Sequence, residues 1–254
     1  MIFRILLFLT LCLGVAPSAT AAVPPRLIAD ISQSRVDIVY SFAGAELLVF
    51  GAIQYPGGIT PEVRPDMVIV LRGPPQSITV RRKSRILGLW LNTDSLRFET
   101  APSFFRAAST RPVADLVDEQ TAAIYELSPE YLQLSPTGTL DPGKIDRFEA
   151  GLLTTRTQEA MFGMDPGGVD IVQNVLYRAR LEIPSAVPVG TYTVESHLIQ
   201  DGAVVASTTE AIAIEKSGFE RNVYVASQRE SLLYGIFCVA IALLLGWAAA
   251  VFRR

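Results

Sequence analysis

The stretch Thr191–Glu215, TYTVESHLIQDGAVVASTTEAIAIE, decides the fold class that the sequence predicts. Its two halves, Thr191–Gln200 and Ala203–Glu215, both have strand patterns. They are joined by Asp201-Gly202, a dipeptide favoured in two-residue type I′ hairpins because both central positions need a positive φ. The stretch therefore predicts an antiparallel hairpin within a chain whose core is built from β-sheets.

Further strand patterns precede this hairpin. Apolar and polar residues alternate at 35–40 and at 177–183, which is typical of half-buried strands. Glu46–Phe50 and Asp66–Leu71 have the continuous apolar pattern of strands buried on both faces. Clusters of glycine and proline mark turns between these runs. Short strands with this spacing predict a mainly β body, an immunoglobulin-like β-sandwich.

The region 110–163 has helical patterns and is predicted to be an insertion in the sandwich. Asp141 suits an N-cap and is followed by Pro142, which suits a first helical turn. Apolar residues then mark one helix face, at Ile145, Phe148, Leu152 and Leu153. We expect this helix to end at Gly163 and a shorter helix to cover Thr110–Val117.

The C-terminal segment Ser231–Phe252 predicts a transmembrane helix. It is an uncharged run of 22 residues, and about 20 apolar residues cross a hydrocarbon core of about 30 Å. Arg253 and Arg254 follow it, so the positive-inside rule places this two-residue tail in the cytoplasm and the preceding body on the other side. A tail of that length leaves no room for a signalling domain.

The N-terminal segment predicts a cleaved signal peptide over residues 1–21. Its apolar core Ile5–Val15 is too short to cross a membrane, and Ala19–Ala21 supplies a cleavage site of the A-x-A type. A retained N-terminal anchor is the alternative. Residues 22–215 are then the periplasmic body, and 216–230 form a juxtamembrane segment that extends the membrane helix or lies along the interface.

Composition argues against several functional classes. Residues 22–230 hold 19 of the 22 basic residues and all 25 acidic residues, a net charge of −6, which is unsuited to nucleic acid. Cys12 and Cys238 both lie in the terminal apolar segments, so the body has no thiol chemistry. The only histidine, His197, is expected to be a solvated or hydrogen-bonded sheet residue. We expect no catalytic residue, no metal site and no cofactor.

Basic residues cluster at one place in this acidic body: Arg81, Arg82, Lys83 and Arg85. Together with Arg72 they are the candidate site for an anion or for lipid headgroups. The alternative is an edge strand protected by charge, because lysine and arginine commonly guard sheet edges. The neighbouring Trp90 is expected to lie in the core.

Short motifs along nearly the whole chain carry a resemblance: Leu27–Ser32, Val49–Ala52, Val70–Pro74, Arg82-Lys83, Leu89–Asn92, Val187–Tyr192, Lys216–Glu220 and Leu233–Gly235. On these motifs the chain resembles a family of transmembrane proteins of alphaproteobacteria without an assigned activity. The resemblance implies a bacterial inner-membrane protein with a periplasmic body, and members of such families are sometimes encoded beside sulfite-exporter-type permeases. It implies no catalytic residue.

These observations predict a single-pass protein of the bacterial inner membrane, in contact with the lipid bilayer. Its expected function is non-enzymatic: an accessory or assembly partner of another membrane protein, with a permease as one candidate. A periplasmic anion-binding or sensing module that uses the basic cluster 81–85 is the second hypothesis. An unrecognised hydrolase is the third, and it would require a pocket with clustered carboxylates.

Overall fold

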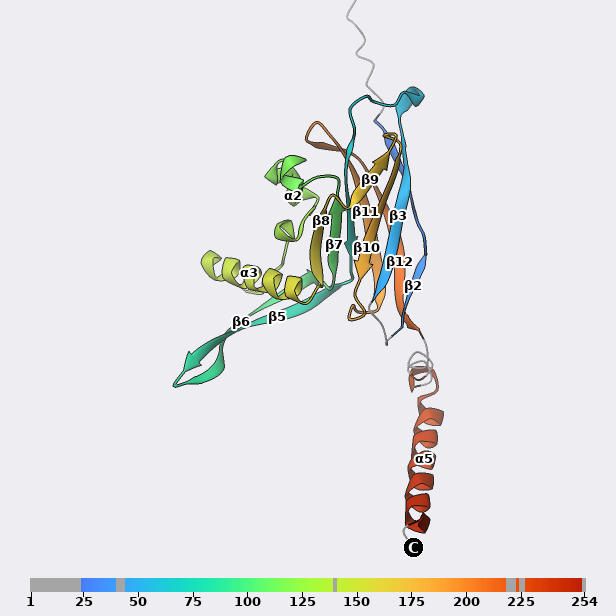
Figure 1. The fold of residues 1–254 in the computed structure, drawn as a ribbon. Helices are drawn as coiled ribbons and strands as arrows, with labels where there is room; N and C mark the ends of the chain where they lie inside the picture. The colour runs from blue at the N-terminus through green and yellow to red at the C-terminus, as the bar shows by residue number, and fades with distance from the viewer. Residues whose placement is uncertain (1–23, 40–43, 139–140, 218–222, 224–226, 253–254) are drawn as a thin grey trace, which may run out of the picture.

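The computed structural model describes residues 24–39, 44–138, 141–217, 223 and 227–252. Figure 1 shows a body of β-sheets, an arm of two strands, a group of short helices and a separate C-terminal helix. The described chain is mainly β with one apolar helix at its C-terminal end, as the sequence predicts. The predicted signal peptide (1–21) and cytoplasmic tail (253–254) lie outside the described residues.

Two sheets make up the body. The first contains, in spatial order, β1 (Arg26–Ile31), β3 (Ala45–Gln54), β10 (Leu176–Ile183) and β9 (Val169–Val172). The second contains β2 (Arg35–Val39), β12 (Ala203–Ser217), β11 (Gly190–Gln200), β4 (Asp66–Arg72), β7 (Phe105–Ser109) and β8 (Phe162–Pro166). Neighbouring strands are antiparallel except for the pairs β2–β12 and β7–β8.

One hydrophobic core joins the two sheets. Leu47 and Tyr177 enter it from the first sheet, and Leu71 and Tyr192 from the second. Residues of the insertion, such as Leu127, belong to the same cluster. Strand β4 is therefore buried along its length, as its continuous apolar pattern predicts. Removing this apolar surface from water is the main favourable contribution to the fold.

The hairpin β11–β12 forms as its turn residues predict. Asp201 has φ 51° and Gly202 has φ 79°, the positive values that a type I′ turn requires. Gln200 pairs with Ala203 across the turn, and the pairing continues as far as Gly190 opposite Ile214. The turn fixes the register of the pairs next to it, and an irregularity between Leu198 and Ile199 then shifts the register of the rest of the hairpin by one residue.

The insertion lies between β7 and β8 and corrects two predictions. It contains, in order, the 3₁₀ turn η2 (Val113–Asp115), α2 (Glu119–Ile124), the 3₁₀ turn η3 (Pro129–Tyr131) and α3 (Pro142–Gln158). The helix predicted over Thr110–Val117 is wrong: a single 3₁₀ turn forms there, because the N-cap is Asp118, whose side chain accepts a hydrogen bond from Thr121 N. Helix α3 ends at Gln158, not at Gly163, which lies in β8.

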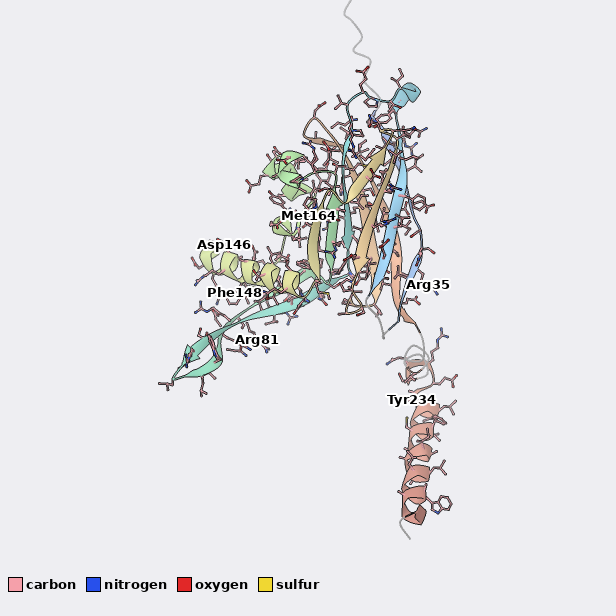
Figure 2. The ribbon with its side chains drawn as sticks, in the orientation of Figure 1. Arg35, Arg81, Asp146, Phe148, Met164 and Tyr234 are labelled. Carbon is pink, nitrogen blue, oxygen red and sulfur yellow. The ribbon has the colours of Figure 1, made fainter. Side chains whose placement is uncertain are left out.

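Strands β5 (Pro75–Ile86) and β6 (Leu89–Pro102) form a two-stranded sheet, the β5–β6 arm. The arm projects from the lower end of the body in Figure 1, and α3 lies along its base. A second small core joins the two: Leu96, Phe98 and Ala101 from the arm, Phe148 and Leu152 from α3. Figure 2 labels Phe148 on α3 and Arg81 on the arm.

Helix α5 (Ser231–Phe252) stands apart from the body (Figure 1). Among the described residues it is the one helix that is long and apolar enough to cross a membrane, and the stretch Ser231–Ala249 has no buried share. Strand β12 continues to Ser217, and residues 218–222 and 224–226 of the predicted juxtamembrane segment lie outside the described residues. The 3₁₀ turn η1 (Pro56–Gly58) lies at the opposite end of the body.

Candidate functional site

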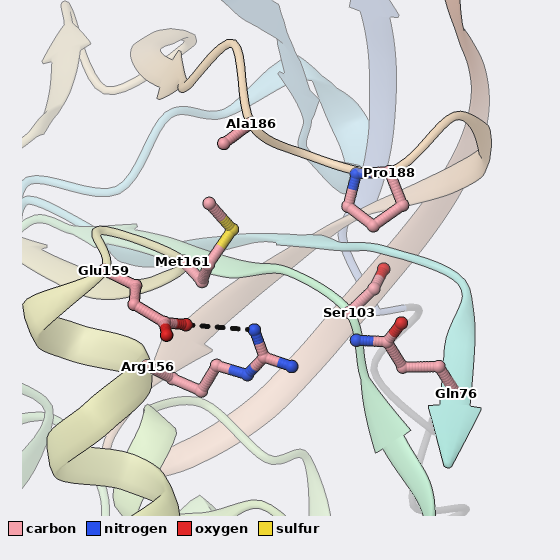
Figure 3. Close-up of a pocket in the computed structure, with 7 residues that line it drawn as sticks. All are labelled: Gln76, Ser103, Arg156, Glu159, Met161, Ala186 and Pro188. Carbon is pink, nitrogen blue, oxygen red and sulfur yellow. Dashed lines mark hydrogen bonds and ion pairs between the residues drawn. The ribbon is translucent and has the colours of Figure 1, made fainter. Parts of the chain in front are cut away.

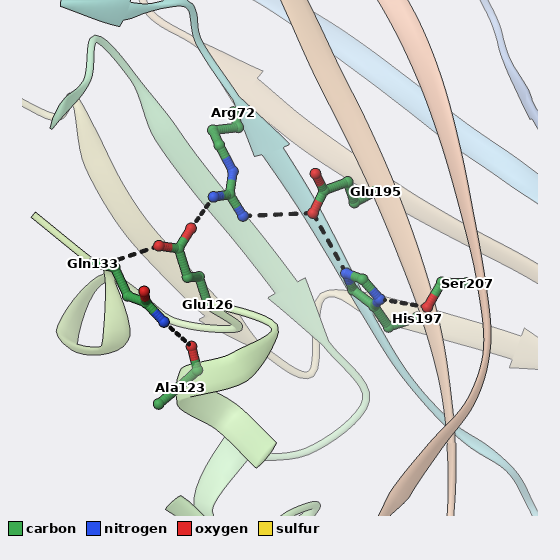
Figure 4. A network of polar contacts seen from close by, with 7 residues as sticks. All are labelled: Arg72, Ala123, Glu126, Gln133, Glu195, His197 and Ser207. Carbon is green, nitrogen blue, oxygen red and sulfur yellow. Dashed lines mark hydrogen bonds and ion pairs between the residues drawn. The ribbon is translucent and has the colours of Figure 1, made fainter. Parts of the chain in front are cut away.

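Arg72 lies in a polar network on the second sheet (Figure 4). Its guanidinium group pairs with Glu126, and its Nη2 lies 3.4 Å from Oε2 of Glu195. Glu126 follows α2, whereas Glu195 comes from β11. The guanidinium carbon also lies 5.9 Å from the centre of the Phe105 ring. Arg72 therefore ties the insertion to the sheet, and its charge is compensated by two carboxylates within the fold.

His197 extends this network into the sheet. Its Nδ1 lies 2.9 Å from Oγ of Ser207, and its Nε2 lies 3.6 Å from Oε2 of Glu195. The imidazole is buried against the edge of the Tyr125 ring, 5.4 Å between centres. The neighbouring imidazole of His197, together with the charge of Arg72, lowers the pKa of Glu195 below its ordinary value of 4.5. His197 is therefore a hydrogen-bonded residue of the sheet, as the sequence predicts.

A pocket of about 550 Å³ lies between α3 and the base of the arm (Figure 3). It is lined by Gln76, Ser103, Arg156, Glu159, Met161, Ala186 and Pro188. Nη1 of Arg156 pairs with Oε2 of Glu159 at 3.1 Å, so the one lining carboxylate is already compensated. Within the described part of the chain, no group of three His, Cys, Asp or Glu side chains could hold a metal ion.

The remaining predicted site residues lie on the outer part of the β5–β6 arm: Arg81, Arg82, Lys83 and Arg85, all exposed. Arg81 is six residues beyond Pro75, where the arm begins, about 20 Å at about 3.3 Å per residue. The structure thus groups these four and separates them from Arg72. Among the described residues, none of the four forms an ion pair with a carboxylate within 4.0 Å.

Exposed apolar residues cap the arm: Ile86, Leu87, Leu89, Trp90 and Leu91. Trp90 is 69% exposed, so the expectation that it lies in the core is wrong. The reason is that the apolar contacts of the arm with α3 end at the level of Val80 and Leu96, and the tip extends beyond them. The arm was not predicted, although the alternation at Ile78 and Val80 is mirrored at Leu96 and Phe98, a signal for a hairpin.

Comparison with known proteins identifies the family. A family model described as "Putative transmembrane protein (Alph_Pro_TM)" matches residues 26–254, which include the body, the arm and α5. The chain belongs to this family. Family membership and the apolar, unburied α5 together support its description as a membrane protein, with α5 as the candidate span.

The other comparisons add little. No curated protein matches the chain. Among solved structures the chain is similar to Spo0M, a sporulation control protein from Bacillus subtilis, at 12% sequence identity and a TM-score of 0.34. That match covers 82% of this chain and 56% of Spo0M, so the chain spans little more than half the length of that protein. Nothing about function or fold is inferred from a likeness of this size.

Proposed function

We propose that this Alph_Pro_TM member is a single-pass protein of the bacterial inner membrane. Its body would lie in the periplasm and act as a non-enzymatic accessory or assembly partner of another membrane protein. The observation that carries the proposal is α5, which is uncharged, apolar and packed against no other part of the described chain. A helix of this kind is stable in hydrocarbon and unstable in water, because its apolar side chains have no other place to be buried.

The orientation rests on the two ends of the sequence. Arg253 and Arg254 follow the apolar run directly, which favours a cytoplasmic C-terminus. The signal-peptide pattern of residues 1–21 favours export of the body that comes after it. Both signals support the same topology, with the body outside the cytoplasm.

The proposal includes an immunoglobulin-like sandwich for the body. The orders β1-β3-β10-β9 and β12-β11-β4-β7 correspond to the orders A-B-E-D and G-F-C-C′ of that architecture. Domains of this class serve many functions, so the architecture by itself does not assign one. It supports a role in contacts, because the body presents sheet surfaces, whereas the carboxylates of the network and the pocket are already ion-paired.

A partner would be reached through α5 as well as through the body. Gly235, Ala240 and Gly246 place small residues along the helix, and small residues allow membrane helices to approach closely. A permease is one candidate for the partner. The lateral face of α5 is therefore the first surface to test.

Co-purification tests this function. The full chain is extracted from membranes in mild detergent, and its co-purifying membrane proteins are quantified beside those of a variant whose segment 231–252 is replaced by an unrelated single span. We expect a specific membrane protein with the native chain and a several-fold smaller amount with the variant at equal expression. Equal recovery of that protein would place the contact in the body alone. The absence of any specific membrane protein from the native preparation would contradict the accessory function.

A further inference from the structure

We propose that the tip of the β5–β6 arm is a second membrane contact, which inserts apolar side chains into the bilayer interface and binds anionic phospholipid headgroups through the basic residues behind it. The proposal rests on the proposed function in one respect, namely that α5 spans the same membrane. The arm tip comprises residues 81–92, and its turn is Leu87-Gly88.

The apolar character of the tip has no explanation within the fold. Leu87 is 99% exposed and Leu89 is 66% exposed, so folding buries nothing of Leu87 and only a minor part of Leu89. Leu87 also has φ 50°, a conformation for which two-residue turns favour asparagine, aspartate or glycine. A run of exposed apolar residues at a strained turn marks a contact surface, since a turn in water is served best by polar residues.

Basic residues lie directly behind this apolar cap. Arg85 pairs with Trp90 across the arm and is two residues from Leu87, about 7 Å along the strand. The headgroup layer is itself about 5–7 Å thick on each side of the hydrocarbon core. With Leu87 at the hydrocarbon boundary, Arg85 would therefore lie among the headgroups, where tryptophan is also enriched.

The charge of the tip is complementary to an anionic surface. Residues 81–92 contain four basic residues and no acidic residue, although the body as a whole is acidic. Asp94, which lies opposite Arg82 at the inner limit of the tip, is paired with Lys144 of α3. Each basic residue near an anionic leaflet strengthens its attraction to that surface. Protection of the edge of β5 accounts for the charges on the strand but leaves the exposed cap Ile86–Leu91 unexplained.

The strand register brings the arm and α5 to the same end of the body. Arg72, at the end of β4 that leads into the arm, pairs with Thr193 of β11. Thr193 in turn pairs with Ala211 of β12, and that strand then runs toward α5. Figure 1 shows the consequence: the arm and α5 extend from the same end, and the tip reaches the level at which α5 begins. A membrane crossed by α5 is therefore met by the tip.

The test uses the fluorescence of Trp90 in the full chain reconstituted into vesicles. The Trp247→Phe background leaves Trp90 as the sole tryptophan. In vesicles with about one third phosphatidylglycerol, brominated acyl chains should quench the fluorescence of Trp90. Acrylamide in the aqueous phase should quench it several-fold less than in the chain unfolded in denaturant without detergent. Neutralising Arg81, Arg82, Lys83 and Arg85 to Gln should lower the ratio of inserted to free tip by about fivefold per residue.

Two matched substitutions separate insertion from folding. Leu87→Asn suits the positive φ of the turn, so the chain should keep or slightly raise its melting temperature while quenching by brominated lipid falls several-fold. Val63→Asn changes another exposed apolar residue, between β3 and β4 at the far end of the body, and should leave the quenching unchanged. If the basic residues bind lipid headgroups, added inorganic phosphate should release the tip no more than sodium chloride of equal ionic strength.

Each contrary outcome overturns a different part of the proposal. If acrylamide quenches Trp90 as fully in vesicles as in the unfolded chain, the membrane contact is overturned, and the cap is left as a surface for a protein partner. Equal quenching in pure phosphatidylcholine overturns the role of the four basic residues, and release by phosphate beyond that by sodium chloride of equal ionic strength overturns the assignment to headgroups. A chain that alkaline carbonate extracts from the vesicles contradicts the membrane span of α5, a failure that is visible separately from the behaviour of Trp90.

Discussion

The core between the two sheets and the tip of the arm hold the same kind of side chain in opposite surroundings. Leu71 in β4 is 0% exposed, whereas Leu87 at the arm tip is 99% exposed. The first belongs to a cluster built from both sheets and the insertion, while the second extends beyond the last contact with α3. Burial explains why the chain has leucine at position 71. The proposed membrane contact would explain leucine at position 87.

The change from buried to exposed apolar side chains takes place within the arm itself. Phe98 and Leu96 are buried against Phe148 of α3, so the base of the arm is part of the folded body. Past the pair formed by Val80 and Leu96, the strands remain hydrogen-bonded but lose their apolar cover. One hairpin can therefore serve the core at one end and an external surface at the other.

The largest expected effect compares the two leucines directly. Leu71→Ala should lower the free energy of unfolding by about 2–5 kcal/mol, because it leaves a cavity in a close-packed core. Leu87→Ala should change it by less than about 0.5 kcal/mol, because the side chain is in solvent in the isolated protein. Urea unfolding of the full chain in detergent measures both. Similar losses for the two variants would break the comparison.

A second, smaller effect is expected in the polar network. Arg72→Met should reduce the free energy of unfolding by about 1–3 kcal/mol, because Glu126 and Glu195 lose their shared cation while partly buried. Arg178→Met removes an arginine that pairs with Asp170 at 2.8 Å on the exposed surface, and it should cost less than about 1 kcal/mol. Equal losses would show that the network around Arg72 behaves as an ordinary surface pair.

The network should also make the body sensitive to acid. Since the pKa of Glu195 in the folded chain is below its ordinary value of 4.5, its contribution to stability is present above that pH and is lost as the pH falls through the folded pKa. The free energy of unfolding, measured by denaturation at several pH values between 7 and 3, should therefore fall less over this range for Glu195→Gln than for the native chain. An identical pH dependence of the two proteins would argue against this role.

The smallest effect concerns the ion pair between α3 and the arm. Nζ of Lys144 lies 2.7 Å from Oδ1 of Asp94, a contact between α3 and the arm. Lys144→Gln should lower the free energy of unfolding by about 0.2–1 kcal/mol, as is usual for exposed pairs. Hydrogen exchange should rise in the arm near Asp94 and stay unchanged in β4. A rise in both would mean that the arm and the core unfold as one unit.

Sequence reasoning succeeded where local chemistry decides the structure. Asp201-Gly202 specifies its turn by backbone conformation alone, and the continuous apolar run of Asp66–Leu71 specifies a strand buried on both faces. The helix expected over Thr110–Val117 failed because the capping hydrogen bond of Asp118 begins the helix later. The mainly β class, the hairpin and the buried strand were thus predictable. The helix boundaries depended on hydrogen bonds that composition does not reveal.

The candidate site was only partly predictable. The four basic residues at 81–85 were recognised as a cluster, and the structure keeps them together. The sequence prediction groups Arg72 with these four residues, yet an extended strand carries them away from it. Trp90 was placed in the core because tryptophan is usually well buried, but its surroundings depend on where α3 stops, a tertiary fact.

Cysteine labelling in spheroplasts tests the central claim, that α5 crosses the membrane and the tip meets it from the outside. With Cys12 and Cys238 replaced by Ser, single cysteines are placed at Thr157 on α3, at Leu87 and at Arg254. We expect a membrane-impermeant maleimide to label position 157 at once, position 87 only after detergent dissolves the bilayer, and position 254 only after the membrane is breached. Labelling at position 87 as fast as at position 157, or at position 254 in intact spheroplasts, would contradict this claim.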